Sequence, residues 1–267
     1  MLENTVVAIT GAAQGIGRAI ALKMAALGAD VCVADINRLG AETVADEVRA
    51  LGRNALALHV DVTDQVSTQN MMRAVSDNFG RLDVAVCNAG IVQVKPFFEI
   101  TAADWNRTMS VNGLGTFLTL QSAALVMQEQ GPMGPGRPHG KIINMASIAG
   151  RYGAGAMAPM TPHYRASKAA VISLTQTASF GLAPKITVNA VCPGIVDTDM
   201  WTQIDREWGE AEQLQPGEAW KSRTAAIPMG RPQTSADVAD VVGFLSSPSS
   251  DYMTGQSINV DGGLALS

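Results

Sequence analysis

The chain has few charged side chains and very little histidine or cysteine. Lys, Arg, Asp and Glu make up 16% of its 267 residues, the formal net charge is −5, and there are three histidines and three cysteines. We find no basic cluster that would bind a phosphate backbone, which argues against a nucleic-acid partner. Cys32, Cys87 and Cys192 lie far apart in apolar runs, so neither a disulfide set nor a metal site is predicted.

The sequence also lacks an uninterrupted apolar run of membrane-spanning length. Met1 leads almost directly into an apolar run at residues 5–10, without a charged region and a cleavable apolar stretch before it. We therefore expect a cytoplasmic protein that has no membrane partner.

Short runs rich in Val and Ile alternate with segments whose apolar residues recur at three- and four-residue steps. The runs cover residues 6–10, 30–35, 55–61, 82–88, 141–147, 186–192 and 256–260, and the clearest helical patterns cover 15–27, 39–51, 65–79 and 164–182. Most of the runs lack alternation, which is typical of strands covered on both faces, and strands joined by helices need crossovers. The sequence predicts one α/β domain over residues 1–267. We expect a doubly wound, seven-stranded parallel sheet of Rossmann type with helices on both faces.

Two segments break this rhythm. Residues 129–140 hold three prolines and four glycines and are expected to form an exposed turn. Residues 195–231 form the longest stretch without a predicted strand and contain three of the four tryptophans. Long loops in compact domains are usually functional, and open α/β sheets bind ligands beyond the carboxyl ends of their strands. We expect a substrate lid at about 195–231.

A glycine-rich segment follows the first predicted strand and opens a helix. Gly11 is expected to take the tight turn, Gly15 to let the backbone approach a pyrophosphate, and Gly17 to let the helix pack closely on the sheet. Gln14 and Ile16 lie between them, where the helix N-terminus offers free N–H groups to phosphates. The spacing Gly-x3-Gly-x-Gly differs from Gly-x-Gly-x2-Gly, so a glycine turn without a ligand stays open as an alternative.

An acidic residue at the end of the second predicted strand strengthens the dinucleotide interpretation. Asp35 lies 18 residues beyond Gly17, where a carboxylate can bond the adenosine ribose hydroxyls and repel a 2′-phosphate. Arg38 is the nearby cation, and we interpret it as a solvated residue at a helix start. We therefore expect NAD rather than NADP.

The third and fourth predicted strands end on further candidates. Asp61 and Val62 close the third strand and can hold the adenine edge, although a helix N-cap role for Asp61 or Thr63 is an alternative. Asn88, Ala89 and Gly90 close the fourth strand, and their small size lets the backbone approach the cofactor.

A Tyr-x3-Lys pair is the sharpest chemical signal. Tyr164 and Lys168 share one face of a predicted helix, one turn apart. Hydride transfer to a ketone needs a proton donor, and oxidation of the alcohol needs a base. A nearby ammonium favours the phenolate and would lower a tyrosine pKa from its ordinary value of about 10. Alone, such a pair is more often two exposed residues without a catalytic role, but its position among alternating strands and helices favours a catalytic site.

Ser147 ends the fifth predicted strand, where its hydroxyl can hydrogen-bond the reacting oxygen; a helix or turn cap is the alternative. Asn112 lies in the helical pattern after the fourth strand. It can hold a water that passes protons from Lys168, or mark a capped kink.

These motifs, in this order, resemble the short-chain dehydrogenase/reductase family over nearly the whole chain, from about residue 5 to residue 263. The resemblance implies a tetrad in which Tyr164 is the acid/base, Ser147 contacts the substrate oxygen, Lys168 binds the ribose and tunes the tyrosine, and Asn112 holds a water. It places Asn88 by the cofactor. It also implies homotetramers, with long helices and residues 261–263 at the interfaces. After the turn Pro193-Gly194, contacts to the nicotinamide carboxamide are implied for Ile195 and Thr198.

One departure concerns the segment before the tyrosine. Ser147 and Tyr164 are 17 residues apart, more than is usual in the family, and the extra residues fall in 153–163. This longer loop is expected to reshape the substrate entrance. His163 adjoins Tyr164, but a chemical role for it is not favoured.

The substrate is predicted from a closer likeness. Residues 141–147, 169–176 and 194–197 resemble the polyol dehydrogenases of this family, the bacterial sorbitol and galactitol enzymes. Against a polyol, the lid and loop carry apolar groups that suit an apolar secondary alcohol, namely Met157, Met160, Met200, Trp201 and Trp208. The polar candidates for binding several hydroxyls are Asp197, Asp199 and Gln203.

We therefore predict an NAD-dependent oxidoreductase that interconverts a small-molecule secondary alcohol, a polyol by preference, and its ketone. The alternatives are a 3-oxoacyl carrier-protein reductase or general ketone reductase, which Asp35 and the negative net charge disfavour, and a non-catalytic dinucleotide sensor, which the intact tetrad disfavours.

Overall fold

A computed structural model describes residues 1–153, 155 and 157–265. Its core is one seven-stranded sheet with the order β3-β2-β1-β4-β5-β6-β7, and every strand pair is parallel. The strands are β1 Val6–Thr10, β2 Asp30–Asp35, β3 Ala55–His59, β4 Val84–Cys87, β5 Gly140–Met145, β6 Ile186–Pro193 and β7 Ser257–Val260. The predicted doubly wound sheet is confirmed. The observed strands β3, β4 and β5 end one or two residues earlier than predicted.

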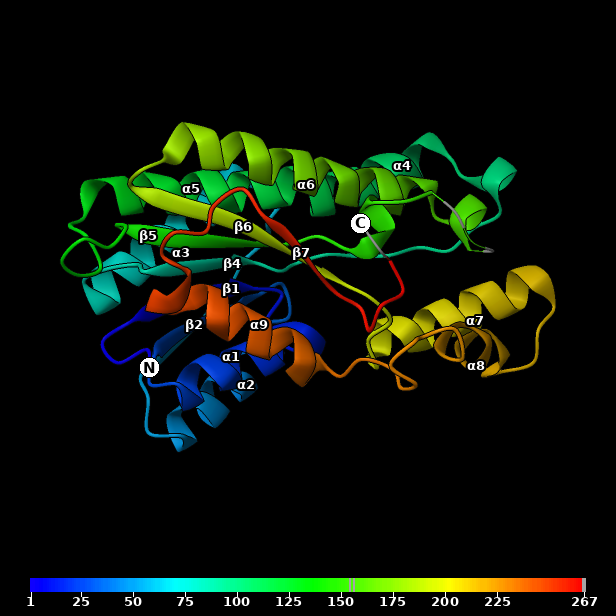
Figure 1. Cartoon of the computed structure of the whole chain (residues 1–267), viewed down its shortest axis with the longest axis horizontal. Helices are drawn as coiled ribbons and strands as arrows, with labels where there is room; N and C mark the ends of the chain where they lie inside the picture. The colour runs from blue at the N-terminus through cyan, green and yellow to red at the C-terminus, as the bar shows by residue number, and fades with distance from the viewer. Residues whose placement is uncertain (154, 156, 266–267) are drawn as a thin grey trace.

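Helices cover both faces of this sheet (Figure 1). They are α1 Gly15–Ala26, α2 Arg38–Ala50, α3 Gln65–Phe79, α4 Ala102–Met109, α5 Gly115–Glu129, α6 Pro162–Leu182, α7 Asp199–Glu212, α8 Glu218–Thr224 and α9 Ser235–Ser246. Helices α1, α2 and α9 pack on one face, while α3, α5 and α6 pack on the other. Both faces of the central strands are therefore shielded from solvent, while the edge strands β3 and β7 are partly exposed.

The strand residues explain why the runs showed no alternation. Successive residues of β1 point to opposite faces, so that Val7 and Ile9 join the core under α1 while Val6 and Ala8 join the core under α3 and α5. Because each face is covered by helices, both sets are apolar. The lack of alternation in the sequence thus reflects the burial of both faces of the strand.

The segment predicted as an exposed turn, residues 129–140, links α5 to β5. Arg137 within it donates to the Asp251 carboxylate at 2.7 Å, and the buried ammonium of Lys141 approaches the same carboxylate at 2.7 Å. The turn is therefore anchored to the chain just before β7.

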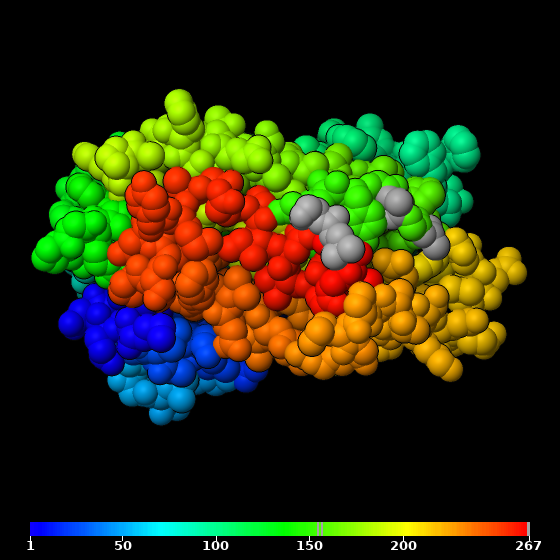
Figure 2. All heavy atoms as spheres, viewed as in Figure 1, coloured from blue at the N-terminus to red at the C-terminus, as the bar shows by residue number. Residues whose placement is uncertain are grey.

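The stretch expected to lack strands folds as two helices, α7 and α8, beyond the carboxyl ends of the strands (Figure 1). Asp205 of α7 accepts hydrogen bonds from the backbone N–H groups of Gly217 at 2.7 Å and Trp220 at 2.8 Å, which fixes α8 against α7. The space-filling view shows the C-terminal stretch lying against this region (Figure 2), where the Met229 N–H donates to the Gly262 carbonyl at 3.1 Å.

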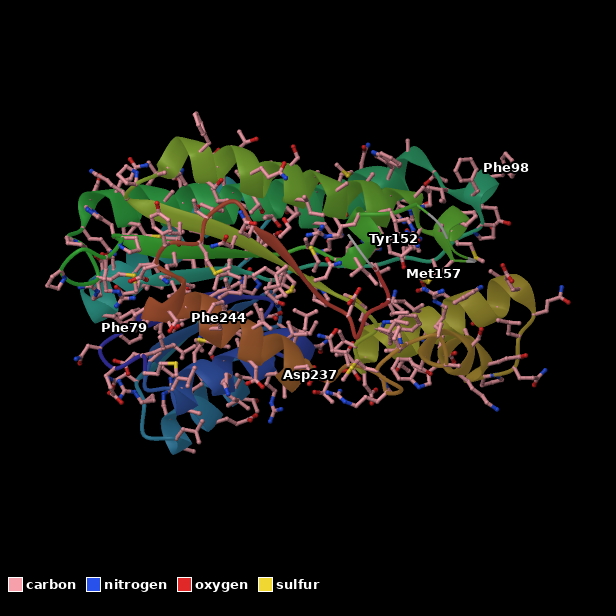
Figure 3. All side chains as sticks on the ribbon, viewed as in Figure 1. Phe79, Phe98, Tyr152, Met157, Asp237 and Phe244 are labelled. Atoms are coloured by element: carbon pink, nitrogen blue, oxygen red, sulfur yellow. The ribbon has the colours of Figure 1, made fainter. Side chains whose placement is uncertain are left out.

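An extended segment, residues 91–95, ties α7 to the sheet. Gln203 donates to the Val92 carbonyl at 3.1 Å, and Glu207 accepts from the Val94 N–H at 2.8 Å. The N–H of Lys95 then donates to the Met160 carbonyl at 3.0 Å. The longer loop around 153–163 includes residues 154 and 156, which lie outside the described part; Tyr152 and Met157 beside them are seen in Figure 3.

Candidate active site

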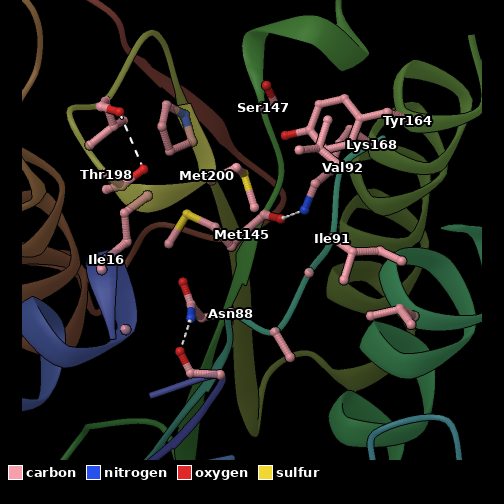
Figure 4. Close-up of a pocket in the computed structure, with 18 of the residues that line it drawn as sticks. Ile16, Asn88, Ile91, Val92, Met145, Ser147, Tyr164, Lys168, Thr198 and Met200 are labelled. Carbon is pink, nitrogen blue, oxygen red and sulfur yellow. Dashed lines mark hydrogen bonds between the residues drawn. The ribbon is translucent and has the colours of Figure 1, made fainter. Parts of the chain in front are cut away.

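A cavity of about 840 Å³ opens at the carboxyl edge of the sheet (Figure 4). Its walls come from the loop between β1 and α1, the ends of β2 to β6, the start of α6 and the α7–α8 segment. Of the predicted site residues, those that line it are Gly11, Gln14, Gly15, Ile16, Gly17, Asp35, Asp61, Val62, Asn88, Ala89, Gly90, Ser147, Tyr164, Lys168, Pro193, Gly194, Ile195 and Thr198. Asn112 does not line the cavity.

The glycine loop forms a cradle that side chains would fill. A Cβ on Gly17 would collide with the Gly11 carbonyl and lie 2.8 Å from the Ala12 Cα, so no larger residue fits there. Gly11 has φ +64°, a conformation that favours glycine, and its missing Cβ leaves room for the Ala89 backbone. Gln14 provides no side-chain cap for α1, so the first-turn N–H groups are free to bind phosphate oxygens.

Asn88 holds this loop in place. Its side-chain amide donates to the carbonyls of Thr10 and Gly11, both at 2.9 Å. In return, the Thr10 hydroxyl accepts from the backbone N–H groups of Asn88 at 3.1 Å and Ala89 at 3.2 Å. The carboxyl ends of β1 and β4 are thereby locked together beneath the cradle.

The two acidic residues of the cofactor end differ in their surroundings. Asp35 accepts hydrogen bonds from the backbone N–H groups of Ala13 at 3.0 Å and Asn37 at 2.8 Å, while its neighbour Arg38 is exposed and pairs with Glu42. A cofactor 2′-phosphate beside Asp35 would meet a carboxylate, and Arg38 is already paired. This arrangement fits NAD.

Asp61 accepts from the hydroxyl of Thr63 at 2.7 Å and from its N–H at 2.9 Å, and these hydrogen bonds lower its pKa. The alternative that Asp61 or Thr63 caps the next helix is wrong. Asp64 is the N-cap of α3 and accepts from the N–H groups of Val66 and Ser67. Asp61 is therefore free to face the cavity.

The chemical groups lie on the opposite wall. The Lys168 ammonium is 5.8 Å from the centre of the Tyr164 ring, and it donates to the Met145 carbonyl at 2.8 Å. Ser147 follows β5 and accepts from the Ala149 N–H at 3.1 Å. It therefore also caps the turn that follows it, which was the alternative role predicted for it. Figure 4 shows Ser147, Tyr164 and Lys168 together on this wall, across from Ile16 and Asn88.

The pKa values of this pair are governed by burial. Burial raises the pKa of the Tyr164 hydroxyl, and a hydrogen bond with Ser147 acts in the opposite direction. Burial lowers the pKa of Lys168 to about 8. The expected lowering of the tyrosine pKa by Lys168 is not found in the chain itself, because loss of solvent outweighs the neighbouring charges. In this state Tyr164 is a phenol, ready to donate its proton.

Asn112 lies in a π-helical turn, Ser110–Leu114, which agrees with the prediction that this residue can mark a kink. Its side chain is fully buried and fully bonded. The carbonyl oxygen accepts from the Ile91 N–H at 2.8 Å, and the amide donates to the Ile91 carbonyl at 2.9 Å and to the Ser167 hydroxyl at 3.0 Å. Asn112 thus joins the segment 91–95 to the helix that carries Tyr164.

Pro193 and Gly194 lead the chain from β6 into the α7–α8 segment. A Cβ on Gly194 would lie 2.8 Å from the Asp261 Cα, so the two loops touch here. Thr198 precedes α7, and its methyl group lies next to Gly15; a Cβ on that glycine would be 3.7 Å from it. The start of α7 therefore lies directly over the glycine loop.

The far end of the cavity, which we call the substrate end, is largely apolar. It is lined by Val92, Ser147, Tyr152, Met157, Tyr164, Arg165, Met200, Trp201, Ile204 and Arg223. Met160 and Trp208 are buried beneath it and do not line it. Of the polar candidates only Asp199 lines the cavity: Asp197 is exposed, and Gln203 is used in binding Val92 and Glu207.

Sequence reasoning missed the arginines of this end, Arg165 and Arg223, and also Tyr152 and Arg107. The position of Arg165 directly after Tyr164 was the one available signal. His163, on the other side of Tyr164, is fully buried, and burial lowers its pKa. It does not line the cavity.

Two negative findings apply to the described residues. They contain no group of three or more His, Cys, Asp or Glu side chains arranged to hold a metal ion. None of their helices combines the length and apolar character needed to cross a membrane.

Comparison with known proteins places this geometry in a family. A family model described as enoyl-(acyl carrier protein) reductase, of the short-chain dehydrogenase type, matches residues 11–265. The chain is 42% identical to an L-2,3-butanediol dehydrogenase of Corynebacterium glutamicum and 40% identical to a sorbitol dehydrogenase of Cereibacter sphaeroides, in each case over 98% of both chains.

Among solved structures, an NAD⁺-bound xylitol dehydrogenase superimposes with a TM-score of 0.89 at 30% identity, covering 98% of this chain and 99% of that one. The cradle, the acidic residue beside it and the Ser-Tyr-Lys wall are therefore found in a chain whose relatives are dehydrogenases. The chain belongs to the short-chain dehydrogenase/reductase family, and it is an NAD-dependent oxidoreductase that acts on secondary alcohols and their ketones.

Proposed function

We propose that the chain interconverts a polyol and the corresponding ketone, with Tyr164 as the acid/base. The observation that carries this proposal is the wall on which Ser147, Tyr164 and Lys168 converge, facing the phosphate cradle across one cavity. Bound NAD supplies the hydride acceptor in oxidation, and its reduced form supplies the donor in reduction. The chain's own residues must bind the substrate and move its hydroxyl proton.

As the phenolate, Tyr164 takes the alcohol proton during oxidation; as the phenol, it gives its proton to the carbonyl oxygen during reduction. Because burial raises the pKa of Tyr164, the phenol is the resting form, which suits proton donation to a ketone. Ser147 hydrogen-bonds the reacting oxygen and orients it toward Tyr164. Lys168 binds the nicotinamide ribose, and its ammonium stabilises the phenolate when Tyr164 has given up its proton.

Asn112 is assigned here as a positioning residue. Its side-chain bonds to Ile91 and Ser167 connect the extended segment 91–95 to α6, three residues beyond Tyr164. The remaining cofactor contacts follow the lining of the cavity, with the cradle at the pyrophosphate, Asp35 at the adenosine ribose, Asp61 and Val62 at the adenine, and Ile195 and Thr198 at the nicotinamide.

A polyol is favoured because relatives that match 98% of the chain are named as dehydrogenases of 2,3-butanediol and sorbitol, compounds that carry neighbouring hydroxyls. A secondary alcohol with an apolar arm is the second candidate, since Met157, Met200 and Trp201 line the substrate end. A carrier-protein reductase is disfavoured because such enzymes usually prefer NADP, whose 2′-phosphate would meet Asp35.

We further propose one domain over residues 1–267, with 195–231 acting as a lid, and a homotetramer in the cytoplasm. The large apolar side chains exposed on helices α4, α5 and α6, namely Trp105, Phe117, Leu125 and Phe180, support assembly through these helices. Light scattering should give four times the chain mass of 27.9 kDa. The three cysteines are free and buried, which suits a reducing compartment.

The test follows nicotinamide absorbance with NAD and a panel of sorbitol, galactitol, 2,3-butanediol and 2-butanol. Tyr164→Phe should lower kcat for the preferred alcohol by about 100-fold or more, with a small change in KM, because it removes the proton acceptor. Tyr252→Phe is the matched control, since Tyr252 is fully exposed. Full activity in Tyr164→Phe would refute the assignment, and oxidation of 2-butanol alone would favour the second candidate.

A further inference from the structure

Two arginines from different elements line the substrate end of the cavity. Arg165 directly follows Tyr164 on α6, and Arg223 lies near the end of α8. Both line the cavity that Tyr164 and Ser147 also line. A neutral polyol offers no charge for them to bind, so their presence calls for an explanation.

Neither arginine finds a carboxylate among the described residues. Arg165 donates to the Tyr152 carbonyl at 2.6 Å and to the Thr161 hydroxyl at 3.3 Å, both neutral acceptors. The Nε of Arg223 is buried and has no hydrogen-bond partner in the described part of the chain. By contrast, the half-buried arginines Arg53 and Arg137 each pair with aspartate.

Two partly buried arginines close together are energetically unfavourable without a counter-ion. Burial lowers the pKa of Arg165, and the positive charge of Arg223 acts in the same direction, so the two guanidinium groups are close enough to repel each other. A desolvated cation is stabilised when it is paired with an anion and hydrogen-bonded. Asp199 lines the cavity too, but it forms no salt bridge with either arginine within the described residues.

We propose that the natural substrate is a polyhydroxy compound with an oxyanion, a carboxylate or phosphate, which Arg165 and Arg223 bind while Tyr164 and Ser147 hold the reacting hydroxyl. This inference rests on the proposed function and narrows its substrate class. Planar guanidinium groups with several donors suit both oxyanions. Because Arg223 belongs to the α7–α8 segment, the anion also draws this segment onto the substrate.

The test compares three matched probes with NAD: sorbitol, gluconate and sorbitol 6-phosphate. The wild-type kcat/KM for gluconate or for the phosphate should exceed that for sorbitol by about tenfold or more, because a charge-assisted hydrogen bond contributes that much to binding. Whichever of the two is preferred identifies the oxyanion. The KM for that probe should rise with ionic strength more steeply than the KM for sorbitol.

Variants then test whether the two arginines cause the preference for the anionic probe. Arg223→Gln and Arg165→Gln should each lower the ratio of kcat/KM for the anionic probe over sorbitol by about tenfold. Arg206→Gln is the matched control, because Arg206 is an exposed arginine on the neighbouring helix α7 and its loss removes the same charge. It should leave both efficiencies unchanged.

The outcomes separate the two proposals. If sorbitol is oxidised in a Tyr164-dependent way but no anionic probe is preferred, or if Arg223→Gln leaves the ratio unchanged, the oxyanion site is refuted and the polyol function stands. If no probe is turned over, the polyol function fails. The oxyanion site is then tested by calorimetry alone, as the binding of gluconate and of sorbitol 6-phosphate to the NADH complex. A tenfold weaker affinity in Arg223→Gln supports the oxyanion site. An affinity of wild type for both anionic probes equal to its affinity for sorbitol overturns it.

Discussion

Lys168 is a buried cation whose only hydrogen bond among the described residues is to the Met145 carbonyl. Burial lowers its pKa from 10.5 to about 8. At pH 7 the amine is protonated in both the folded and the unfolded chain, so folding must desolvate a charge. At 1.36 kcal/mol per pKa unit, the cost is about 3 kcal/mol. It is fully present below pH 8 and is relieved as the pH rises from 8 toward 10.5, where only the unfolded chain keeps the proton.

Replacing Lys168 by Met removes this cost and keeps an unbranched side chain that is one atom shorter. The variant also loses the hydrogen bond to Met145, which offsets part of the gain by about 1–3 kcal/mol at every pH. The informative quantity is therefore the change with pH. We expect the free energy of unfolding of Lys168→Met, relative to the wild type, to fall by about 1–1.5 kcal/mol between pH 7 and pH 9. Catalytic activity should be lost at both.

Urea unfolding of the cofactor-free protein, followed by tryptophan fluorescence at one protein concentration, measures this difference. Lys221→Met provides the matched control, because Lys221 is exposed on α8. A difference between Lys168→Met and wild type that stays constant from pH 7 to pH 9 would show that Lys168 is not a desolvated cation in the folded chain. The catalytic reasoning from its burial would then be wrong as well.

Two predictions concern the cofactor end. Gly17→Ala places a Cβ against the Gly11 carbonyl, and the resulting shift of the cradle should weaken NADH binding by about tenfold or more in a fluorescence titration. Gly181→Ala, where a Cβ meets nothing within 4 Å, should bind NADH normally, and equal binding by both variants would contradict the cradle. Asp35→Ser removes the carboxylate that we propose to bind the adenosine ribose, so the ratio of kcat/KM with NADP to that with NAD should rise by about tenfold. An unchanged ratio would show that cofactor choice lies elsewhere.

The fold was accessible from the sequence because its signals are local. Val7 and Ala8 belong to opposite faces, and a run that is apolar on both is enough to predict a covered parallel strand. The helices of the α7–α8 segment were missed, although Trp201, Ile204 and Trp208 have helical spacing and are all buried. The absence of a predicted strand over many residues favours a loop, and this outweighs the helical spacing of three residues.

A place on the cavity wall was predictable where a motif fixes a residue at the end of a strand or on a helix, as for Gly17, Tyr164 and Lys168. Other features depend on tertiary contacts. The bonding of Asn112 to Ile91 and Ser167 requires knowing that a π-helical turn brings it there. Arg165 is a helix residue whose direction depends on how α6 is rotated against the sheet, and Arg223 reaches the cavity only through the packing of α8. No sequence spacing carries that information.

The segment 91–95 has a consequence for how such a sequence can change over time. Asn112, Gln203 and Glu207 contact it through its backbone groups. Every residue provides the C=O, and every residue except proline provides the N–H. These hydrogen bonds therefore exclude only proline, and only at Ile91 and Val94 where an N–H is needed, while burial requires Val92 and Val94 to stay apolar. The requirement for a particular side chain applies instead to the three distant residues that bond this backbone. Val92, which lines the cavity, can therefore be exchanged for another apolar residue without loss of the hydrogen bonds that align α7 with α6.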